Sequence, residues 1–406
     1  MRIAMVSEHA SPLAVLGGPD AGGQNVYVAQ LSRALARRGH QVTVHTRRDA
    51  PGLPDRTALA PGVTVEHVPA GPAEPLPKDE LYPCMGEFGA HLARSWSAAP
   101  PDVAHAHFWM SGLAALDGAR PHGVPVVQTF HALGTVKRRH QGERDTSPAR
   151  RVATERRIAL AAARVLATCG DEVAELSAMG VPPGHTTVVP CGVDTDEFTP
   201  RVAPAADPPR RHPHRLLAAG RLVPRKGFDV AIRALAAVPG TELLIAGGPD
   251  AALLAADDEA ARLLAVAGEH GVADRVRLLG AVGHERMPSL VRSTDLMLAT
   301  PAYEPFGIVP LEAMASGVPV VATGVGGQLD SVADRVTGRL VPPGDPAALA
   351  DAVRGLLTSG QVRAAYGAAG RRRALDRFSW SRVAERVEHV YAKVTAGHRV
   401  PTGVVR

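Results

Sequence analysis

Short apolar runs alternate with longer amphipathic segments along the whole chain. The first apolar run covers residues 2–7, and a helix-like segment at 25–38 follows it. Apolar runs of about four to eight residues between turn signals are typical of strands buried in a parallel sheet. Strands that alternate with helices in this way predict an α/β fold with doubly wound parallel sheets.

The alternation occurs twice, on either side of a segment from Asp194 to His214 that is rich in Pro, Asp and Arg. This composition is typical of a linker between domains. Before the linker, strands are expected at 2–7, 41–46, 63–68, 103–107, 124–130, 165–168 and 187–189. After it, strands are expected at 216–219, 242–246, 276–279, 296–299 and 319–322.

Helices are expected between these strands. They lie at 25–38, 86–97 and 150–163 in the first half, and at 229–236, 251–270, 287–292, 311–315 and 346–359 in the second. A last helix begins at Phe378-Ser379-Trp380 and runs through Lys393. We therefore predict a Rossmann-like domain over 1–197, a linker over 198–213, a second Rossmann-like domain over 214–377, and a terminal helix within 378–396.

A chain of 406 residues is long enough for two such domains. Its 45% hydrophobic and 21% charged content are those of an ordinary globular protein. The longest apolar runs, of about seven residues, are too short to span a membrane. The segment from Met1 to Val6 reads as a buried strand with no cleavage site behind it, so a cytoplasmic protein is expected.

The net charge of +5 raises the question of a nucleic-acid partner. None is expected, because the basic residues are dispersed, are almost all Arg, and have no aromatic residues interleaved with them. Lysine is rare, and the four are Lys78, Lys137, Lys226 and Lys393. Where Arg has otherwise replaced Lys, a retained Lys suggests a site that needs a compact point charge, with Lys226 the first candidate and Lys78 the next.

Two glutamates, Glu304 and Glu312, stand eight positions apart across a strand-to-helix connection. Glu304 follows the apolar strand at 296–299 beside a Pro and near a Gly, and Glu312 falls at the next helix. The N-terminus of that helix offers free N–H groups to an anion. Carboxylates that accept hydrogen bonds from hydroxyls, next to a phosphate cradle, indicate a nucleotide-sugar site.

A basic turn from Gly220 to Asp229 directly follows the first strand of the second half. Breaking a sugar–diphosphate bond leaves growing negative charge on the diphosphate, so the site needs fixed cations. Arg221 can pair with one phosphate through two N–H groups, and Lys226 can place a point charge on another. An exposed basic turn without a ligand is the alternative interpretation.

A Gly-rich loop follows the first strand of the chain. It begins with Glu8 and His9 and contains the string Gly17-Gly18-Pro19-Asp20-Ala21-Gly22-Gly23-Gln24-Asn25. Such a loop can bring backbone N–H groups close to a phosphate. It is not the dinucleotide-binding fingerprint, because no G-x-G-x-x-G follows the strand.

Together these motifs resemble the retaining glycosyltransferases with two Rossmann-like domains, the GT-B fold. The glutamate pair is similar to their E-x7-E element. The Gly-rich string closely resembles the loop of sucrose-phosphate synthases and of the actinobacterial enzymes that join N-acetylglucosamine to inositol phosphate. The resemblance implies a deep cleft between the domains, a donor held by the second domain, an acceptor held by the first, and a terminal helix that crosses back to the first.

The resemblance also assigns roles on the donor side. It implies donor contacts from Gly22, Gly23, Arg221, Lys226, Glu304, Phe306, Gly307, Ile308 and Glu312. Arg221 and Lys226 would stabilise the leaving diphosphate. Glu312 would hold the ribose hydroxyls, while Glu304 and the backbone of 306–308 would hold the sugar. His131, just beyond the strand at 124–130, would position and polarise, because in such enzymes the leaving phosphate takes the acceptor's proton on the same face.

On the acceptor side the resemblance implies contacts from His9, Asp20, Asn25, Lys78, Trp109 and Arg151. Lys78 and Arg151 match cations that bind an acceptor phosphate in the related enzymes, and Lys137 lies close by in sequence. A hydroxyl residue follows the family histidine in those enzymes, but here the residue is Ala132, so the presence of a phosphate on the acceptor stays open. For Trp109, simple packing is the alternative.

No catalytic metal and no other cofactor are expected. Asp194-Thr195-Asp196 has the D-x-D form that holds a metal in glycosyltransferases of another architecture, but its position resembles a structural hinge of this family. His105 and His107 alternate along a strand with no third ligand, which disfavours zinc. The three cysteines lie far apart and read as reduced thiols.

The expected function is transfer of a hexosyl group from a nucleotide sugar, with a UDP-sugar as first choice, to a small sugar or cyclitol with or without a phosphate. One alternative is transfer to a lipid-linked or polysaccharide acceptor, with peripheral contact at the membrane surface. Another is a non-catalytic nucleotide-sugar-binding protein, against which the presence of Arg221, Lys226, Glu304 and His131 argues. The sequence leaves open the sugar, the base, the acceptor, the pathway and the oligomeric state.

Overall fold

The computed structural model describes residues 1–13, 22–200, 208–305 and 307–398. These form two compact units: unit 1 comprises Met1–Pro190 and the segment from Ser381 onward, and unit 2 comprises Cys191–Trp380. The sequence predicts a first domain that ends at 197, and unit 1 ends at Pro190. The residues that follow are held in unit 2, because Val193 pairs with Ser379 and the guanidinium of Arg371 donates to the carbonyls of Thr195 and Phe198.

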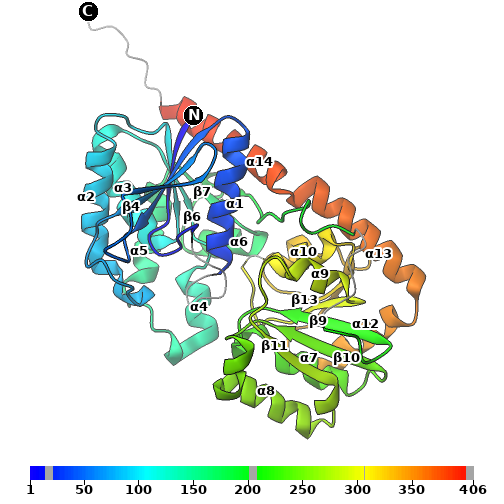
Figure 1. Cartoon of the computed structure of the whole chain (residues 1–406). Coiled ribbons are helices and arrows are strands. Elements are labelled where there is room, and N and C mark those ends of the chain that lie inside the picture. Colours follow the sequence, from blue (N-terminus) through cyan, green and yellow to red (C-terminus); the bar gives the residue numbers. More distant parts are fainter. Residues whose placement is uncertain (14–21, 201–207, 306, 399–406) are drawn as a thin grey trace, which may run out of the picture. The chain divides into compact units, whose positions relative to one another are not determined.

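Unit 1 is built on an eight-stranded sheet with the order β3-β4-β2-β1-β5-β6-β7-β8 (Figure 1). Its strands are β1 (Arg2–Val6), β2 (Gln41–Arg47), β3 (Arg56–Ala60), β4 (Val63–Val68), β5 (Val103–His107), β6 (Val126–Thr129), β7 (Arg164–Ala167) and β8 (Thr186–Val188). All neighbouring pairs are parallel except β3 and β4. The sequence pattern does not predict β3, because it is a half-exposed edge strand without a long apolar run.

Helices cover both faces of this sheet. On one face lie α1 (Gly23–Arg37) and, from Ser381 onward, α14 (Trp380–His398); on the other lie α2 (Met85–Ser95), α3 (Trp109–Ala119) and α5 (Arg151–Ala161). The unit also contains α4 (Gly134–Gln141) and α6 (Gly170–Ala178). The hydroxyl of Tyr391 in α14 lies 2.7 Å from Nδ1 of His105 in β5, which ties the terminal helix to this sheet.

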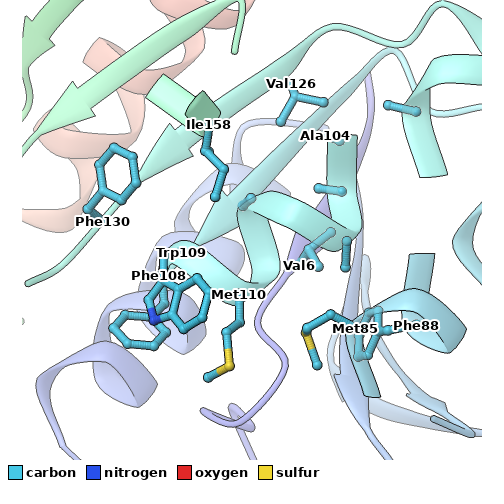
Figure 2. Packing of buried hydrophobic residues seen from close by; sticks show 14 of the residues in the cluster. Val6, Met85, Phe88, Ala104, Phe108, Trp109, Met110, Val126, Phe130 and Ile158 are labelled. Carbon is cyan, nitrogen blue, oxygen red and sulfur yellow. The ribbon is translucent and has the colours of Figure 1, made fainter. Parts of the chain in front are cut away.

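The core between the sheet and α2, α3 and α5 is closely packed. Figure 2 shows side chains of adjacent strands facing those of the three helices. The strands contribute Val6, Ala104 and Val126, and the helices contribute Met85, Phe88, Trp109, Met110 and Ile158, each 3% exposed or less. The sequence pattern does not predict α3, because its residues are buried on nearly all sides and show no strong amphipathic period.

Unit 2 is built on a six-stranded, all-parallel sheet with the order β11-β10-β9-β12-β13-β14. Its strands are β9 (His214–Ala219), β10 (Thr241–Ala246), β11 (Val276–Gly280), β12 (Leu296–Ala299), β13 (Val320–Thr323) and β14 (Gly338–Val341). Its helices are α7 (Phe228–Leu235), α8 (Asp258–Glu269), α9 (Met287–Arg292), α10 (Ile308–Ala315), α11 (Gly327–Ser331), α12 (Pro346–Leu357) and α13 (Gly360–Arg373). The fold class predicted from the alternation, two α/β domains with parallel sheets, is confirmed.

Two predicted helices of unit 2 differ in their bounds. The single helix expected at 251–270 is divided into a 3₁₀ segment, Ala251–Ala256, and α8, because the Asp257 side chain caps α8 by accepting from the Ala260 N–H at 2.8 Å. The helix expected from residue 311 begins earlier, at Ile308, directly after Gly307 in the left-handed conformation. Glu312 therefore lies in the second turn of α10.

In each sheet, the strand order brings together the loops that follow two neighbouring strands. In unit 1 the chain direction across the sheet reverses between β1 and β5, and in unit 2 it reverses between β9 and β12. In open α/β sheets, ligands bind outside the carboxyl ends of the strands at this point of reversal. A ligand site is therefore expected at the residues after β1, β5, β9 and β12.

Within the described ranges, no helix has the length and apolar character needed to cross a membrane.

Candidate active site

In unit 2, the loops that follow β9 and β12 are joined to each other at the point of reversal. The N–H of Ala302 donates to the carbonyl of Arg225 at 2.8 Å, and the hydroxyl of Thr300 donates to the carbonyl of Gly227 at 2.9 Å. Gly227 has φ 65°, and a Cβ at this position would lie 2.0 Å from the Thr300 carbonyl oxygen. Glycine is therefore required where the two loops meet.

Lys226 and Glu304 form an ion pair across these loops. Nζ of Lys226 lies 2.5 Å from Oε2 of Glu304, and the two side chains are 17% and 12% exposed. The backbone of Glu304 is also fixed from the loop after β13, because the N–H of Gly327 donates to its carbonyl at 2.8 Å. A Cβ on Gly326 would lie 2.3 Å from the same carbonyl oxygen, so this approach also depends on glycine. The two charged residues predicted from separate motifs thus lie side by side.

Glu312 lies in α10 in a desolvated setting. Burial of the carboxyl group raises its pKa to about 8, and the negative charge of Glu197 adds to this effect. Among the described residues, no hydrogen-bond donor offsets this rise in the pKa of Glu312. Gly307 and Ile308, also predicted to contact a donor, form the start of the same helix. Arg221, which follows β9, is exposed, and Phe306 lies outside the described residues.

In unit 1, Glu8 follows β1 and is fully buried beside Ser111 of α3 and His9. The Ser111 hydroxyl donates to the Glu8 carboxylate, and Nδ1 of His9 lies 2.7 Å from Oε1 of Glu8. Burial alone would raise the pKa of Glu8, but His9, the hydrogen bond from Ser111 and the charge of Lys78 together lower it. Sequence reasoning missed Glu8 as a candidate, although a carboxylate directly after the first strand is a usable signal.

Lys78 and Arg151 gather around the ring of Phe108, at the end of β5. Nζ of Lys78 lies 3.7 Å from the ring centroid, and Cζ of Arg151 lies 5.0 Å from it. Both are cation–π contacts. Phe108 has φ 79° and ψ 160°, a backbone conformation that non-glycine residues rarely adopt and that is enriched at functional sites. The structure therefore brings together the two cations that were predicted to bind an acceptor phosphate.

Arg151 is also held firmly by the protein. Its Nε donates to Glu155 at 2.7 Å, its Nη2 donates to the Ala132 carbonyl at 2.5 Å, and its Nη1 donates to the Ser147 hydroxyl at 3.1 Å. Lys137 donates to the same Ser147 hydroxyl at 2.9 Å and forms an ion pair with Asp145 at 3.1 Å. Arg151 can thus act at a site through its remaining N–H groups, whereas the position of Lys137 is accounted for by its acidic partner.

His131 lies just beyond β6, with a left-handed φ of 63°. Its side chain is buried, and Nε2 lies 2.9 Å from Nδ1 of His107. The ring of Tyr27 meets it edge-on, with the centroids 5.1 Å apart. Burial lowers the pKa of His131 well below its usual range, so the imidazole is neutral. A neutral imidazole suits the positioning role predicted for it.

The other residues predicted to contact the donor or the acceptor lie at the start of α1, in the core of unit 1, or outside the described residues. Asn25 closes the start of α1, since its Oδ1 accepts from the Gly22 N–H and its Nδ2 donates to the Ser11 carbonyl, both at 3.0 Å. Gly23 is the first residue of that helix, and Asp20 lies outside the described residues. Trp109 is 2% exposed and stacks on Tyr82 at 5.4 Å, the packing arrangement given above as its alternative.

Asp194 and His105 have structural partners. Oδ1 of Asp194 accepts from the N–H groups of Asp196 and Glu197, at 3.0 and 3.1 Å, which closes a local turn. The two ring nitrogens of His105 lie 2.7 Å from the Tyr391 hydroxyl and 2.9 Å from the Thr129 hydroxyl. These contacts account for the presence of both residues.

Comparison with known sequences places each unit in a family. The sequence model of Glycosyltransferase Family 4 matches residues 21–197, and that of Glycosyl transferases group 1 matches residues 205–373. The D-inositol 3-phosphate glycosyltransferase of Acidothermus cellulolyticus is 39% identical over 414 residues, which cover 98% of this chain and 91% of the relative. That of Mycobacteroides abscessus is 37% identical, with 98% of this chain and 91% of the relative covered.

Solved structures show the same similarity. Sucrose-phosphate synthase from Thermosynechococcus elongatus has a TM-score of 0.88 and 31% identity, with 98% of this chain and 99% of that chain covered. Anabaena HepE in complex with UDP-glucose has a TM-score of 0.74 and 21% identity, with 97% of this chain and all of that chain covered. The second match is informative about the fold alone.

Proposed function

Because the chain belongs to the glycosyltransferases that combine a family 4 domain with a group 1 domain, we propose that it transfers a hexosyl group from a UDP-sugar to a phosphorylated cyclitol or sugar. The family and the GT-B fold confirm the resemblance stated from the motifs. Membership of this family also shows that the chain is an enzyme, which rejects the alternative of a non-catalytic nucleotide-sugar-binding protein. The donor, the acceptor and the stereochemistry are the proposed part.

The observation that carries the proposal for the donor is the ion pair between Lys226 and Glu304 at the point of strand reversal in unit 2. A sugar diphosphate offers a partner to each member, since phosphate oxygens accept from the ammonium and sugar hydroxyls donate to the carboxylate. Arg221, exposed on the same loop, would add a second cation for the diphosphate. Glu312 would accept hydrogen bonds from the ribose hydroxyls.

In the proposed reaction, Lys226 and Arg221 stabilise the charge that develops on the leaving diphosphate. The leaving phosphate then accepts the acceptor's proton on the face from which it departs, so the sugar retains its anomeric configuration. Neither Glu304 nor Glu312 attacks the sugar, and neutral His131 positions the reactants. These two cations do the work that a metal does in other transferases, so we propose a metal-independent reaction.

The proposal for the acceptor rests on the pairing of Lys78 and Arg151 around Phe108 in unit 1. Two cations at one aromatic ring offer several N–H donors to a phosphate, with the charge of Arg151 balanced by Glu155 and that of Lys78 added to it. Curated relatives that cover nearly the whole chain carry the name D-inositol 3-phosphate glycosyltransferase, which is the class of acceptor proposed here. Ala132 stands where the related enzymes have a hydroxyl residue, so that donor is missing from the proposed phosphate site. Some N–H groups of Arg151 are already bound to the protein, so fewer remain to bind a phosphate.

The test is a screen of donors followed by acceptors. Thermal shift and donor hydrolysis with UDP-, GDP- and ADP-sugars identify the base, and the preferred donor is then offered to inositol and hexoses with and without a phosphate. We expect UDP-sugars to stabilise the protein and phosphorylated acceptors to raise turnover, with chelating agents leaving the rate unchanged. Equal turnover of both acceptor forms would reject the phosphate site, and turnover of a lipid-linked acceptor alone would favour the membrane alternative.

A further inference from the structure

A second buried histidine, His107, contacts the side chain of His131. His107 projects from β5 and is fully buried, and its Nδ1 lies 2.9 Å from Nε2 of His131. The other ring nitrogen of His107, Nε2, lies 3.3 Å from Sδ of Met5 in β1. Both nitrogens of His107 are thus engaged, one by the site histidine and the other by a thioether.

The sulfur atom decides which nitrogen of His107 carries hydrogen. A thioether has no hydrogen to donate and can act only as a weak acceptor. Nε2 of His107 therefore carries the hydrogen and donates it to Met5. In the neutral ring, Nδ1 is then the acceptor, and the hydrogen between the two rings belongs to Nε2 of His131.

Two other arrangements conflict with this setting. If the hydrogen were on Nδ1 of His107, the lone pair of Nε2 would face the lone pairs of the sulfur in a site without exposed atoms. A charged ring is also disfavoured, because burial lowers the pKa of His107 to about 3 and lowers the pKa of His131 well below its usual range. Both rings are consequently neutral, with one direction of hydrogen bonding.

We propose that His107 is a positioning residue that fixes His131 as the tautomer with hydrogen on Nε2, so that Nδ1 is the acceptor nitrogen of the site histidine. The inference rests on the proposed function in one respect, the placement of His131 at the reacting sugar. Because the only ring hydrogen of His131 is donated to His107, His131 can only accept a hydrogen bond from a substrate hydroxyl, through Nδ1. It also follows that His131 holds no proton to pass to the leaving group, in agreement with a reaction in which the leaving phosphate takes the proton.

Nitrogen NMR of the free protein tests the tautomer directly. Protein labelled with ¹⁵N-histidine gives long-range ¹H–¹⁵N correlations that separate ring nitrogens with hydrogen from those without, and His107→Gln and His131→Gln assign the two rings. We expect Nε2 to carry hydrogen in both histidines. A His131 ring with hydrogen on Nδ1 would overturn the proposal. Because no substrate is present, this result does not depend on the proposed donor or acceptor.

Three variants separate positioning from packing. His107→Leu removes the acceptor, His107→Gln restores one through its amide oxygen, and Met5→Leu removes the sulfur at similar volume. We expect both His131 tautomers to be populated in His107→Leu and in Met5→Leu. His107→Leu should also lower kcat about tenfold to a hundredfold at an unchanged donor KM, as is typical when a residue that orients a functional side chain is lost. His107→Gln should recover most of this loss.

A purely structural His107 predicts a different pattern. The His131 tautomer would then stay on Nε2 in His107→Leu, and the kcat of His107→Gln and His107→Leu would fall equally; either result rejects positioning. If wild type turns over none of the tested pairs of substrates, the proposed function fails, whereas the tautomers of wild type and the three variants still decide the role of His107.

Discussion

The ammonium nitrogen of Lys226 lies 2.5 Å from a carboxylate oxygen of Glu304, on loops that follow two adjacent strands of the sheet in unit 2. The side chains are mostly buried, so neither charge is fully hydrated. Without its partner, each charge would be partly desolvated and would lack a compensating electrostatic interaction. The pair therefore keeps a cation and a carboxylate in place at the point of strand reversal.

Removal of the ammonium should affect the chemical step most. In Lys226→Ala we expect kcat/KM for the UDP-sugar to fall about a hundredfold to a thousandfold, because a fixed donor at developing charge contributes on this scale. Steady-state kinetics with the best donor measures the loss. Lys393→Ala is the matched control, since Lys393 is exposed on α14. Wild-type turnover in Lys226→Ala would reject the role of Lys226 at the diphosphate.

Glu312 should make nucleotide binding depend on pH. Burial raises the pKa of its carboxyl group to about 8, so the acid is protonated at neutral pH in the free protein. Ribose hydroxyls donate to the ionised form, and UDP should therefore bind more tightly as pH rises, by up to tenfold per pH unit, until about pH 8. Isothermal titration calorimetry between pH 6 and 9 measures this slope. Glu312→Gln should bind with no such dependence, and an equal slope in both proteins would contradict the assignment.

The same group has an effect on stability with a definite sign. The unfolded chain loses the Glu312 proton near the ordinary carboxyl pKa of 4.5, and the folded protein loses it near 8. Between these values the folded state holds more protons, so the free energy of unfolding falls as pH rises, by at most about 1.4 kcal/mol per pH unit. Urea unfolding of Glu312→Gln should show this decline reduced.

The sheets could be predicted where strands are continuous apolar runs buried on both faces. All six residues of β10 are buried, and its pattern is read easily from the sequence. β14 escapes prediction, because it is short, begins with Gly338 and leaves its two middle residues half-exposed. α13 is not predicted either, because its side chains show little helical periodicity. Its position depends instead on Gly367 and Gly370, which allow close approach to residues near α10.

The site could be predicted as residues but not as contacts. Lys226 and Glu304 are separated by 78 positions, and they meet because β9 and β12 are neighbours in the sheet. No local pattern determines that order. The sequence indicates His107 only as a possible zinc ligand, because its partners Met5 and His131 come from other strands or their ends. The sequence does not predict a role for Glu8, because its partner Ser111 lies in α3, a helix without a clear periodic pattern.

Lys78 should discriminate between acceptors. Its Nζ lies 3.7 Å from the Phe108 ring centroid, and its side chain is partly exposed. In Lys78→Ala we expect KM for a phosphorylated acceptor to rise about tenfold or more, as loss of a hydrogen bond to a charged group predicts. The KM of the same acceptor without phosphate should stay unchanged. Initial rates with the matched acceptors measure both, and an equal change in the two values would rule out a phosphate contact.

Trp109 should matter for stability rather than for acceptor binding. It is 2% exposed and stacks on Tyr82 within the core of unit 1. Trp109→Ala should lower the free energy of unfolding by about 3–5 kcal/mol, as expected for a buried aromatic residue. Trp109→Phe, which retains an aromatic ring, should lose much less and keep the wild-type acceptor KM. A raised acceptor KM in Trp109→Phe at wild-type stability would instead support the pocket role predicted from the sequence.

Arg151 should contribute to stability as well as to acceptor binding, because it neutralises Glu155 in the interior. The two side chains are 4% and 0% exposed, with Nε and Oε1 2.7 Å apart. Removing one member of a buried pair costs about 3–5 kcal/mol, since the other charge is left without compensation. Burial already raises the pKa of Glu155, and without Arg151 that pKa should rise further. Arg151→Met should therefore be destabilised more at pH 8 than at pH 5, where Glu155 can be protonated. Urea unfolding of Arg151→Met and of Arg151→Met/Glu155→Gln measures this, and equal destabilisation at both pH values would contradict it.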